Sequence, residues 1–248
     1  MANLRCCGES VLIGAMPWDF WLILLILATL IPWRGRVRLQ KLLSLPAFGT
    51  KEKLVLYGTT IAFQWMLLAV VGWRAIARGL SQSELGLGRG LDATIILWSV
   101  TGAIAVSAFQ WFNLKRIGGM SGAVPELMRK LSQRLLPQTP VESGPYAALA
   151  VTAGVCEEFV YRGFVMAALT RSGLAAWMVL VLSSALFGLA HAYQGRSGII
   201  GTTLMGFVFG LVRVATVSLF PAVVWHACVD LVAGAAGPRF LAAPKKPQ

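Results

Sequence analysis

Seven long apolar segments run through the chain, and they restrict its fold more than any other feature. They lie approximately at residues 18–33, 54–73, 93–112, 146–169, 174–192, 198–215 and 219–236. A helix needs about 20 mainly apolar residues to cross the hydrocarbon core of a bilayer. Inside that core the backbone groups must bond one another, which a helix achieves within a single segment. We therefore expect an all-α, polytopic transmembrane bundle of seven helices, or eight if a further half-buried segment enters near the N-terminus.

The composition supports a membrane protein and argues against a nucleic-acid partner. Hydrophobic residues make up 57% of the chain and charged residues 13%, whereas a soluble domain carries about 25% charged residues. The formal net charge is +12. The basic residues lie between the apolar segments rather than along one stripe, so we attribute them to membrane topology and to anionic membrane lipids.

Basic residues are concentrated in alternate loops, which predicts an orientation. Cytoplasmic loops of membrane proteins carry an excess of lysine and arginine. We therefore expect a multi-pass protein of the cell membrane, with its N-terminus outside and its C-terminus in the cytoplasm. The residues of the predicted cytoplasmic loops and tail are Arg34, Arg36, Arg38, Lys41, Lys51, Lys53, Lys115, Arg116, Arg129, Lys130, Arg134, Arg239, Lys245 and Lys246.

The segment "PELMRKLSQRLL", residues 125–136, is too polar to span a membrane. Its leucines recur every fourth residue among basic residues, a pattern typical of an amphipathic helix on the cytoplasmic surface. A solvated connector is the alternative. The four cysteines show no CxxC spacing, which indicates neither a zinc ribbon nor a disulfide framework. They are Cys6, Cys7, Cys156 and Cys228.

The stretch "CEEFVYRGF" places three ionisable groups inside the fourth apolar segment. Glu158 and Arg162 are spaced i, i+4, so they can form an ion pair that lowers the cost of burying both. Glu157 points about 100° away on a helix and lacks Arg162 as a direct neighbour. A buried carboxylate without a full charge partner suits a general base near neutral pH. We therefore expect Glu158 to be structural and Glu157 to be reactive.

Both histidines also lie in apolar segments. His191 ends the sequence "FGLAH", and His226 precedes Asp230 by one helical turn in "HACVD". We expect Asp230 to hydrogen-bond with His226 and keep that ring charged, although a protonated Asp230 is the alternative. Ionisable groups within a bilayer converge on one another or on a water-filled cavity. The set resembles a hydrolytic site, with a structural ion cluster or a proton or ion relay as alternatives.

These motifs resemble those of a known family. "EEFVYRG" fits EExxxR, "FGLAH" fits FxxxH and "HACVD" fits HxxxN/D, and their order and spacing are similar to those of the CPBP intramembrane proteases. This family, also called Abi, includes type II CAAX prenyl endopeptidases and bacteriocin-processing or immunity-associated proteins. The resemblance divides the chain into residues 1–91, with a tail and two membrane helices, a protease-like domain at 92–236, and a basic tail at 237–248. Tyrosine replaces phenylalanine in the frequent "FRG", and Asp230 stands where many members have asparagine.

The resemblance implies a role for each matching residue. Glu157 would activate a water, and His191 would position that water or protonate the leaving amine. His226 and Asp230 would stabilise the oxyanion. Members of the family have been described both as metalloproteases and as glutamate enzymes. Glu157, His191 and His226 could supply three ligands of an open zinc site. However, the zinc-binding motif HExxH is absent. If Glu157 were a metal ligand, no residue would be assigned as the general base. We therefore favour a water activated by the glutamate without a catalytic metal.

We therefore predict an intramembrane endopeptidase. Its substrate would be a membrane-associated peptide or protein. Candidates are a prenylated C-terminal peptide, a bacteriocin or pheromone leader, and a membrane-protein segment. A proton-coupled transporter is the first alternative, but such transporters more often show internal repeats or paired broken helices. A non-catalytic immunity or scaffold protein is the second.

Overall fold

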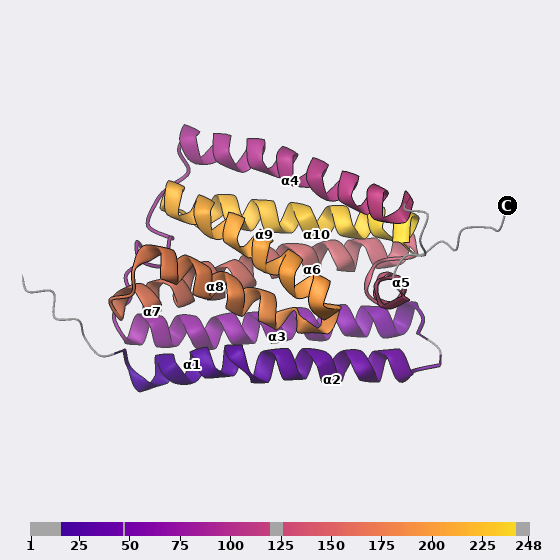
Figure 1. Ribbon diagram of the computed structural model, residues 1–248, viewed down its shortest axis with the longest axis horizontal. Helices are drawn as coiled ribbons and strands as arrows, with labels where there is room; N and C mark the ends of the chain where they lie inside the picture. Colours follow the sequence, from indigo (N-terminus) through magenta and orange to yellow (C-terminus); the bar gives the residue numbers. More distant parts are fainter. Residues whose placement is uncertain (1–15, 47, 120–125, 242–248) are drawn as a thin grey trace, which may run out of the picture.

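The computed structural model describes residues 16–46, 48–119 and 126–241, and within these ranges the chain forms helices and no strands. Most of the helices run along one axis as a bundle (Figure 1). The prediction of an all-α fold is therefore confirmed. Cys6, Cys7, Lys245 and Lys246 lie outside the described residues. The main helices are α1 (Trp18–Ala28), α2 (Leu30–Ser44), α3 (Thr50–Ala77), α4 (Ala93–Gly119), α5 (Glu126–Leu135), α6 (Pro140–Glu158), α7 (Met166–Arg171), α8 (Ala176–Ala190), α9 (Gly195–Thr216) and α10 (Phe220–Leu241).

Five helical stretches in the described chain are long and apolar enough to cross a membrane: Trp18–Ser44, Thr50–Ala77, Ala93–Gly119, Ala192–Thr216 and Phe220–Leu241. The protein is thus an integral membrane protein. The predicted number of seven spans is not confirmed. The fifth predicted segment forms α8, which has only 15 residues. The fourth is helical but carries the charged residues of the candidate site.

The helical stretch that contains the first predicted span extends beyond its apolar residues, to Ser44. It consists of α1 and α2, which are separated by a break at Thr29. Pro32 lies in the first turn of α2, where its missing N–H is tolerated, but its ring would clash with the carbonyl of residue 28 in a continuous helix. Thr29 leaves the helical conformation (φ −121°, ψ −62°), and its hydroxyl donates to the Leu25 carbonyl at 2.6 Å. The basic second half, α2, continues in roughly the same direction as α1 (Figure 1).

Helix α6 lies at the centre of the bundle, between α3 on one side and α10 on the other, and α4 covers the far side of α10 (Figure 1). A glycine allows the contact between α6 and α10 to be close. A Cβ atom on Gly154 would lie 2.9 Å from the Val223 carbonyl oxygen and 3.1 Å from the Ala227 nitrogen. This close approach brings the polar residues of α6 and α10 together.

The helix of the fourth predicted span changes its winding directly after the two glutamates. Residues Phe159–Val165, labelled η1, form a π-helix between α6 and α7. Such segments are rare and frequently occur at functional sites. The apolar pattern predicted one continuous α-helix. A π-helix has about one more residue per turn, and the periodicity of apolar residues does not reveal so short a change.

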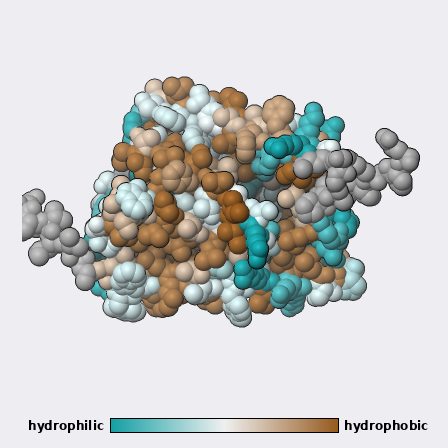
Figure 2. All heavy atoms as spheres, in the orientation of Figure 1, coloured by the Kyte–Doolittle hydropathy of each residue, from teal (hydrophilic) through white to brown (hydrophobic). Residues whose placement is uncertain are grey.

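Helix α5 confirms the helix predicted at residues 125–136, although its place on a membrane surface stays a prediction. It is held at one end of the bundle by α3 and by the α2–α3 connection. The Tyr57 hydroxyl donates to the Leu135 carbonyl at 2.9 Å, and Arg134 donates to the Leu45 carbonyl at 2.8 Å. Hydrophobic residues cover the middle of the face in Figure 2, and hydrophilic residues are most frequent toward the end where α5 lies.

Candidate active site

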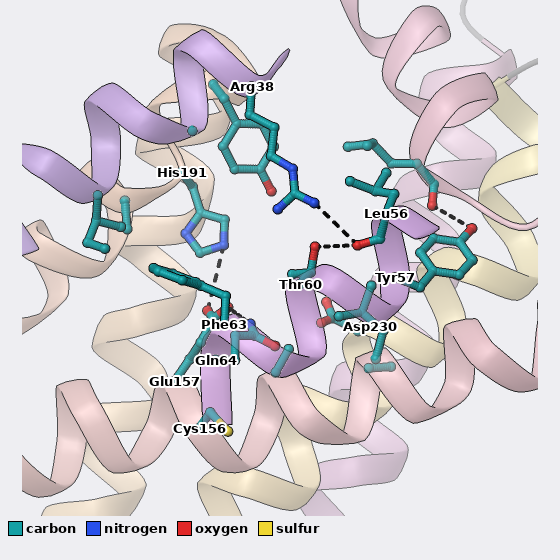
Figure 3. Close-up of a pocket in the computed structure, with 18 of the residues that line it drawn as sticks. Arg38, Leu56, Tyr57, Thr60, Phe63, Gln64, Cys156, Glu157, His191 and Asp230 are labelled. Atoms are coloured by element: carbon teal, nitrogen blue, oxygen red, sulfur yellow. Dashed lines mark hydrogen bonds and ion pairs between the residues drawn. The ribbon is translucent and has the colours of Figure 1, made fainter. Parts of the chain in front are cut away.

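A cavity of about 370 Å³ opens between α2, α3, α6 and α10 and is lined mainly by apolar side chains. Four of the predicted catalytic residues line it: Glu157, His191, His226 and Asp230. Figure 3 shows Glu157 and His191 pointing toward one another in this space, with residues of α3 beside them. The sequence prediction that these groups converge is therefore correct.

Glu157 lies near the end of α6, with its side chain 21% exposed. One carboxylate oxygen, Oε1, accepts a hydrogen bond from Gln64 Nε2 at 2.7 Å. The other, Oε2, lies 3.8 Å from Nε2 of His191. This second oxygen faces the cavity with no direct hydrogen bond from the described residues, as a general base requires.

His191 is the residue at which α8 ends. Its Nδ1 lies 2.9 Å from the carbonyl oxygen of Phe187, one turn earlier. A carbonyl can only accept, so Nδ1 carries a hydrogen, and in the neutral form of the ring the lone pair of Nε2 faces Glu157. The Phe187 ring packs beside the imidazole, with centroids 4.8 Å apart, and fixes its plane further.

Glu158 and Arg162 are fully buried and form the predicted i, i+4 ion pair, with Arg162 Nη1 2.8 Å from Glu158 Oε1. The same Oε1 atom lies 2.8 Å from Nδ1 of His226. Arg162 also stacks over the ring of Phe187, 4.2 Å from its centroid. Glu158 therefore connects the arginine of η1 to the histidine of α10, a contact that the sequence did not indicate.

His226 lies between two carboxyl groups. Its Nε2 is 3.7 Å from Oδ2 of Asp230, which is longer than a hydrogen bond. The expected direct bond between Asp230 and His226 is thus absent, and Glu158 is the near partner of the ring. The Asp230 side chain is 35% exposed and lines the cavity.

The candidate zinc ligands do not form a suitable group. Among the described residues, no three His, Cys, Asp or Glu side chains are placed to hold a metal ion. Glu157, His191 and His226 therefore do not fit the open zinc site that the sequence allowed.

The sequence analysis did not identify the contribution of α2 and α3. Gln64 of α3 bonds Glu157, and Arg38 of α2 and Tyr57 of α3 line the same cavity (Figure 3). An amide inside an apolar segment is costly to bury without a partner, so Gln64 was a signal available in the sequence. The predicted boundary at residue 91 does not separate these helices from the site.

The fold and the cavity define a polytopic helical membrane protein with a polar site buried between its helices. Residues 142–232 match the family described as type II CAAX prenyl endopeptidase Rce1-like. This match over part of the chain agrees with the resemblance to the CPBP proteases that the sequence motifs indicated. The match supports an intramembrane endopeptidase that acts on a membrane-associated peptide or protein. No curated protein and no solved structure matches the chain.

Proposed function

We propose that the protein hydrolyses a peptide bond in the membrane with a water molecule that Glu157 activates. The observation that carries this proposal is the pair of facing acceptors, Glu157 Oε2 and His191 Nε2, 3.8 Å apart in the cavity. One water can donate a hydrogen bond to each of them. A nucleophilic water held between a carboxylate and an imidazole is suited to general-base attack on a carbonyl carbon.

In the proposed reaction, Glu157 takes one proton from the water while the water oxygen bonds to the scissile carbonyl carbon. The carbonyl oxygen becomes an oxyanion, which needs donors placed in advance. His226 is suited to this role when its ring is protonated, because Nδ1–H then donates to Glu158 and Nε2–H remains as a donor toward the cavity. The intermediate collapses when the carbon–nitrogen bond breaks, and the proton from Glu157 passes, directly or through His191, to the leaving amine.

We also propose an orientation and a substrate class. The end of the bundle that carries α5 would face the cytoplasm, with the N-terminus outside, because the basic loops belong to that end. The cavity walls are largely apolar, which favours a lipidated or otherwise membrane-associated peptide over a soluble polar one. Anionic lipids would surround the basic end.

The test is cleavage of a peptide library by protein purified in detergent. Glu157→Gln keeps a side-chain oxygen that can accept from Gln64, so the variant should unfold at the wild-type temperature. Loss of the base should lower cleavage by about 10²- to 10⁴-fold. Glu126→Gln on α5, where the side chain is 56% exposed, is the matched control and should cleave normally. Cleavage by Glu157→Gln at the wild-type rate would refute the proposal.

Addition of a chelator distinguishes a metal-dependent mechanism from a metal-independent one, the two mechanisms described for the family. Cleavage that persists in excess chelator is the result expected for a water activated by Glu157 alone. Cleavage abolished by chelator and restored by zinc would refute the metal-independent mechanism, while the assignment of Glu157 as an essential residue would stand.

A further inference from the structure

One face of α3 lines the cavity, and Gln64 lies on this face. Tyr57, Thr60 and Gln64 follow one another at spacings of three and four residues, and all three line the cavity (Figure 3), as residues on one face of a helix do. The next two residues, Trp65 and Met66, are exposed apolar side chains. Gln64 is therefore an amide on the inner side of a helix whose outer side is apolar.

The amide of Gln64 makes one strong hydrogen bond and leaves one atom unsatisfied. Its Nε2 lies 2.7 Å from Glu157 Oε1. An ionised carboxylate can only accept, so the atom that faces it must be the amide donor. The amide Oε1 is buried and has no hydrogen-bond partner among the described residues. A methionine would fill a similar volume without a buried, unpaired acceptor, so the amide at this position serves its bond to Glu157.

An amide in a membrane helix can also act simply by joining two helices, but other contacts already join α3 to α6. Lys53 forms a buried ion pair with Glu142 at 3.1 Å, and Thr50 donates to the same carboxylate at 2.6 Å. Lys53 and Gln64 are 11 residues apart in the sequence, which is about 16 Å along the helix. The bond from Gln64 therefore acts mainly on the Glu157 carboxylate.

We propose that Gln64 is a positioning residue for the reaction, because its amide occupies Oε1 of Glu157 and directs Oε2 toward the water. This inference rests on the proposed function. Oε2 faces His191 with no direct hydrogen bond from the described residues, so it is the oxygen that takes the proton. A base that is oriented in advance lowers the barrier to proton transfer. The matched residues 142–232 do not include α3, so this part of the site comes from outside the matched region.

The experiment measures kcat and KM for the best-cleaved peptide of the library, in detergent, with wild type and three variants. Gln64→Met removes the donor and keeps an apolar side chain of similar length. Its kcat should fall by about 10- to 100-fold, as for the loss of a hydrogen bond to a charged group. Its KM should stay within about twofold, because neither polar atom of Gln64 is free to bind substrate. Gln110→Met is the matched control on α4, because Gln110 is half-buried but does not line the cavity, and its kcat should be unchanged.

The third variant, Gln64→Glu, distinguishes a hydrogen bond from a requirement for volume. Two carboxyl groups so close together cannot both be ionised without strong repulsion, so they would share one proton. The introduced carboxyl group can then donate to Glu157 in place of the amide. At acidic pH this variant should therefore be more active than Gln64→Met, and its activity should fall as the pair loses the shared proton at higher pH. The other ionisable groups that line the cavity from α2, α8, α10 and the α8–α9 connection are unchanged in every variant: Arg34, Arg38, His191, Tyr193, His226 and Asp230.

Thermal unfolding of each variant is the control for folding. Gln64→Met should unfold close to the wild-type temperature, because Glu157 is partly exposed and methionine is apolar. If this variant does not fold, the pH profile of Gln64→Glu against wild type decides, and a profile with the wild-type shape would overturn the inference.

Four further results would overturn the inference while the dependence on Glu157 stands. They are a wild-type kcat in Gln64→Met, a loss confined to KM, an equal loss in Gln110→Met, and parallel pH profiles of Gln64→Met and Gln64→Glu. The proposed function fails in a different way, which is absence of cleavage by wild type or a wild-type rate in Glu157→Gln. The positioning role of Gln64 would then fail with it.

Discussion

Nδ1 of His226 and Oε1 of Glu158 lie 2.8 Å apart, and this contact joins α10 to α6 beside the cavity. The same oxygen lies 2.8 Å from Nη1 of Arg162. Glu158 is completely buried, so its charge is compensated by these two neighbours rather than by water. The carboxylate therefore holds the arginine of η1 and the orientation of the histidine at once.

Replacement of this carboxylate should cost stability. Glu158→Gln leaves Arg162 buried without an anion, and breaking a buried ion pair costs about 3–5 kcal/mol. Thermal unfolding in detergent should show a large decrease in the unfolding temperature, whereas Glu157→Gln should show almost none. The assignment of the two glutamates would be reversed if Glu158→Gln were stable but inactive and Glu157→Gln remained active.

The sequence predicted the helical bundle and the Glu158–Arg162 pair because both follow from local rules. Apolar length predicts membrane helices, and i, i+4 spacing predicts the Glu158–Arg162 pair. The Glu158–His226 bond and the Gln64–Glu157 bond could not be predicted in this way. Each joins residues on different helices, and their distance depends on how those helices pack. The π-helix was also missed, because a shift in backbone bonding leaves the apolar composition unchanged.

Close packing against Arg162 predicts a second stability effect. A Cβ atom on Gly206 of α9 would lie 2.6 Å from Arg162 Nη2 and 3.0 Å from the Phe187 ring. Gly206→Ala should therefore overpack the site and destabilise the protein by about 1–3 kcal/mol. Gly201→Ala, on the same helix with nothing within 4 Å of its Cβ position, should unfold at or above the wild-type temperature. Equal effects at the two positions would contradict the packing described here.

The Glu84–Arg171 pair, at the end of the bundle opposite α5, predicts a pH effect. Arg171 donates two hydrogen bonds to Glu84, at 2.6 and 2.8 Å, and this lowers the pKa of the carboxyl group to about 2. The pair stabilises the fold above the unfolded pKa of about 4.3, and this contribution is lost as the pH falls toward the folded value. Solvent exposure limits it to about 1 kcal/mol or less.

The measurement compares wild type with Glu84→Gln in detergent. Wild type should unfold at a higher temperature at pH 7, and the difference should shrink as the pH falls from about 4 to 2. A difference that stays constant across this range would mean that the ionised carboxylate is not its source.

The proposed orientation predicts which positions an impermeant maleimide reaches in intact cells. In a background without native cysteines, Arg36→Cys on α2 and Lys130→Cys on α5 should remain unlabelled. Gln82→Cys, exposed in the loop between α3 and α4, should be labelled. All three should react after the membrane is permeabilised, which is the control for side-chain access. Labelling of Arg36→Cys from outside would overturn the orientation.

Asp230 is the residue for which the sequence and the structure favour different roles. The i, i+4 spacing suggested a direct bond that keeps His226 charged, but the ring is held by Glu158 and Asp230 Oδ2 is 3.7 Å away. Asp230 faces the cavity, where an ionised carboxylate would repel an oxyanion and an amide would donate to it. We therefore expect Asp230→Asn to retain cleavage within about tenfold of wild type, because it loses no bond that orients the ring. Asp230→Ala, which can donate nothing, should lose more. If asparagine and alanine are equally inactive in a protein that remains folded, the negative charge itself is required, and Asp230 acts with Glu158 to hold the charge on His226.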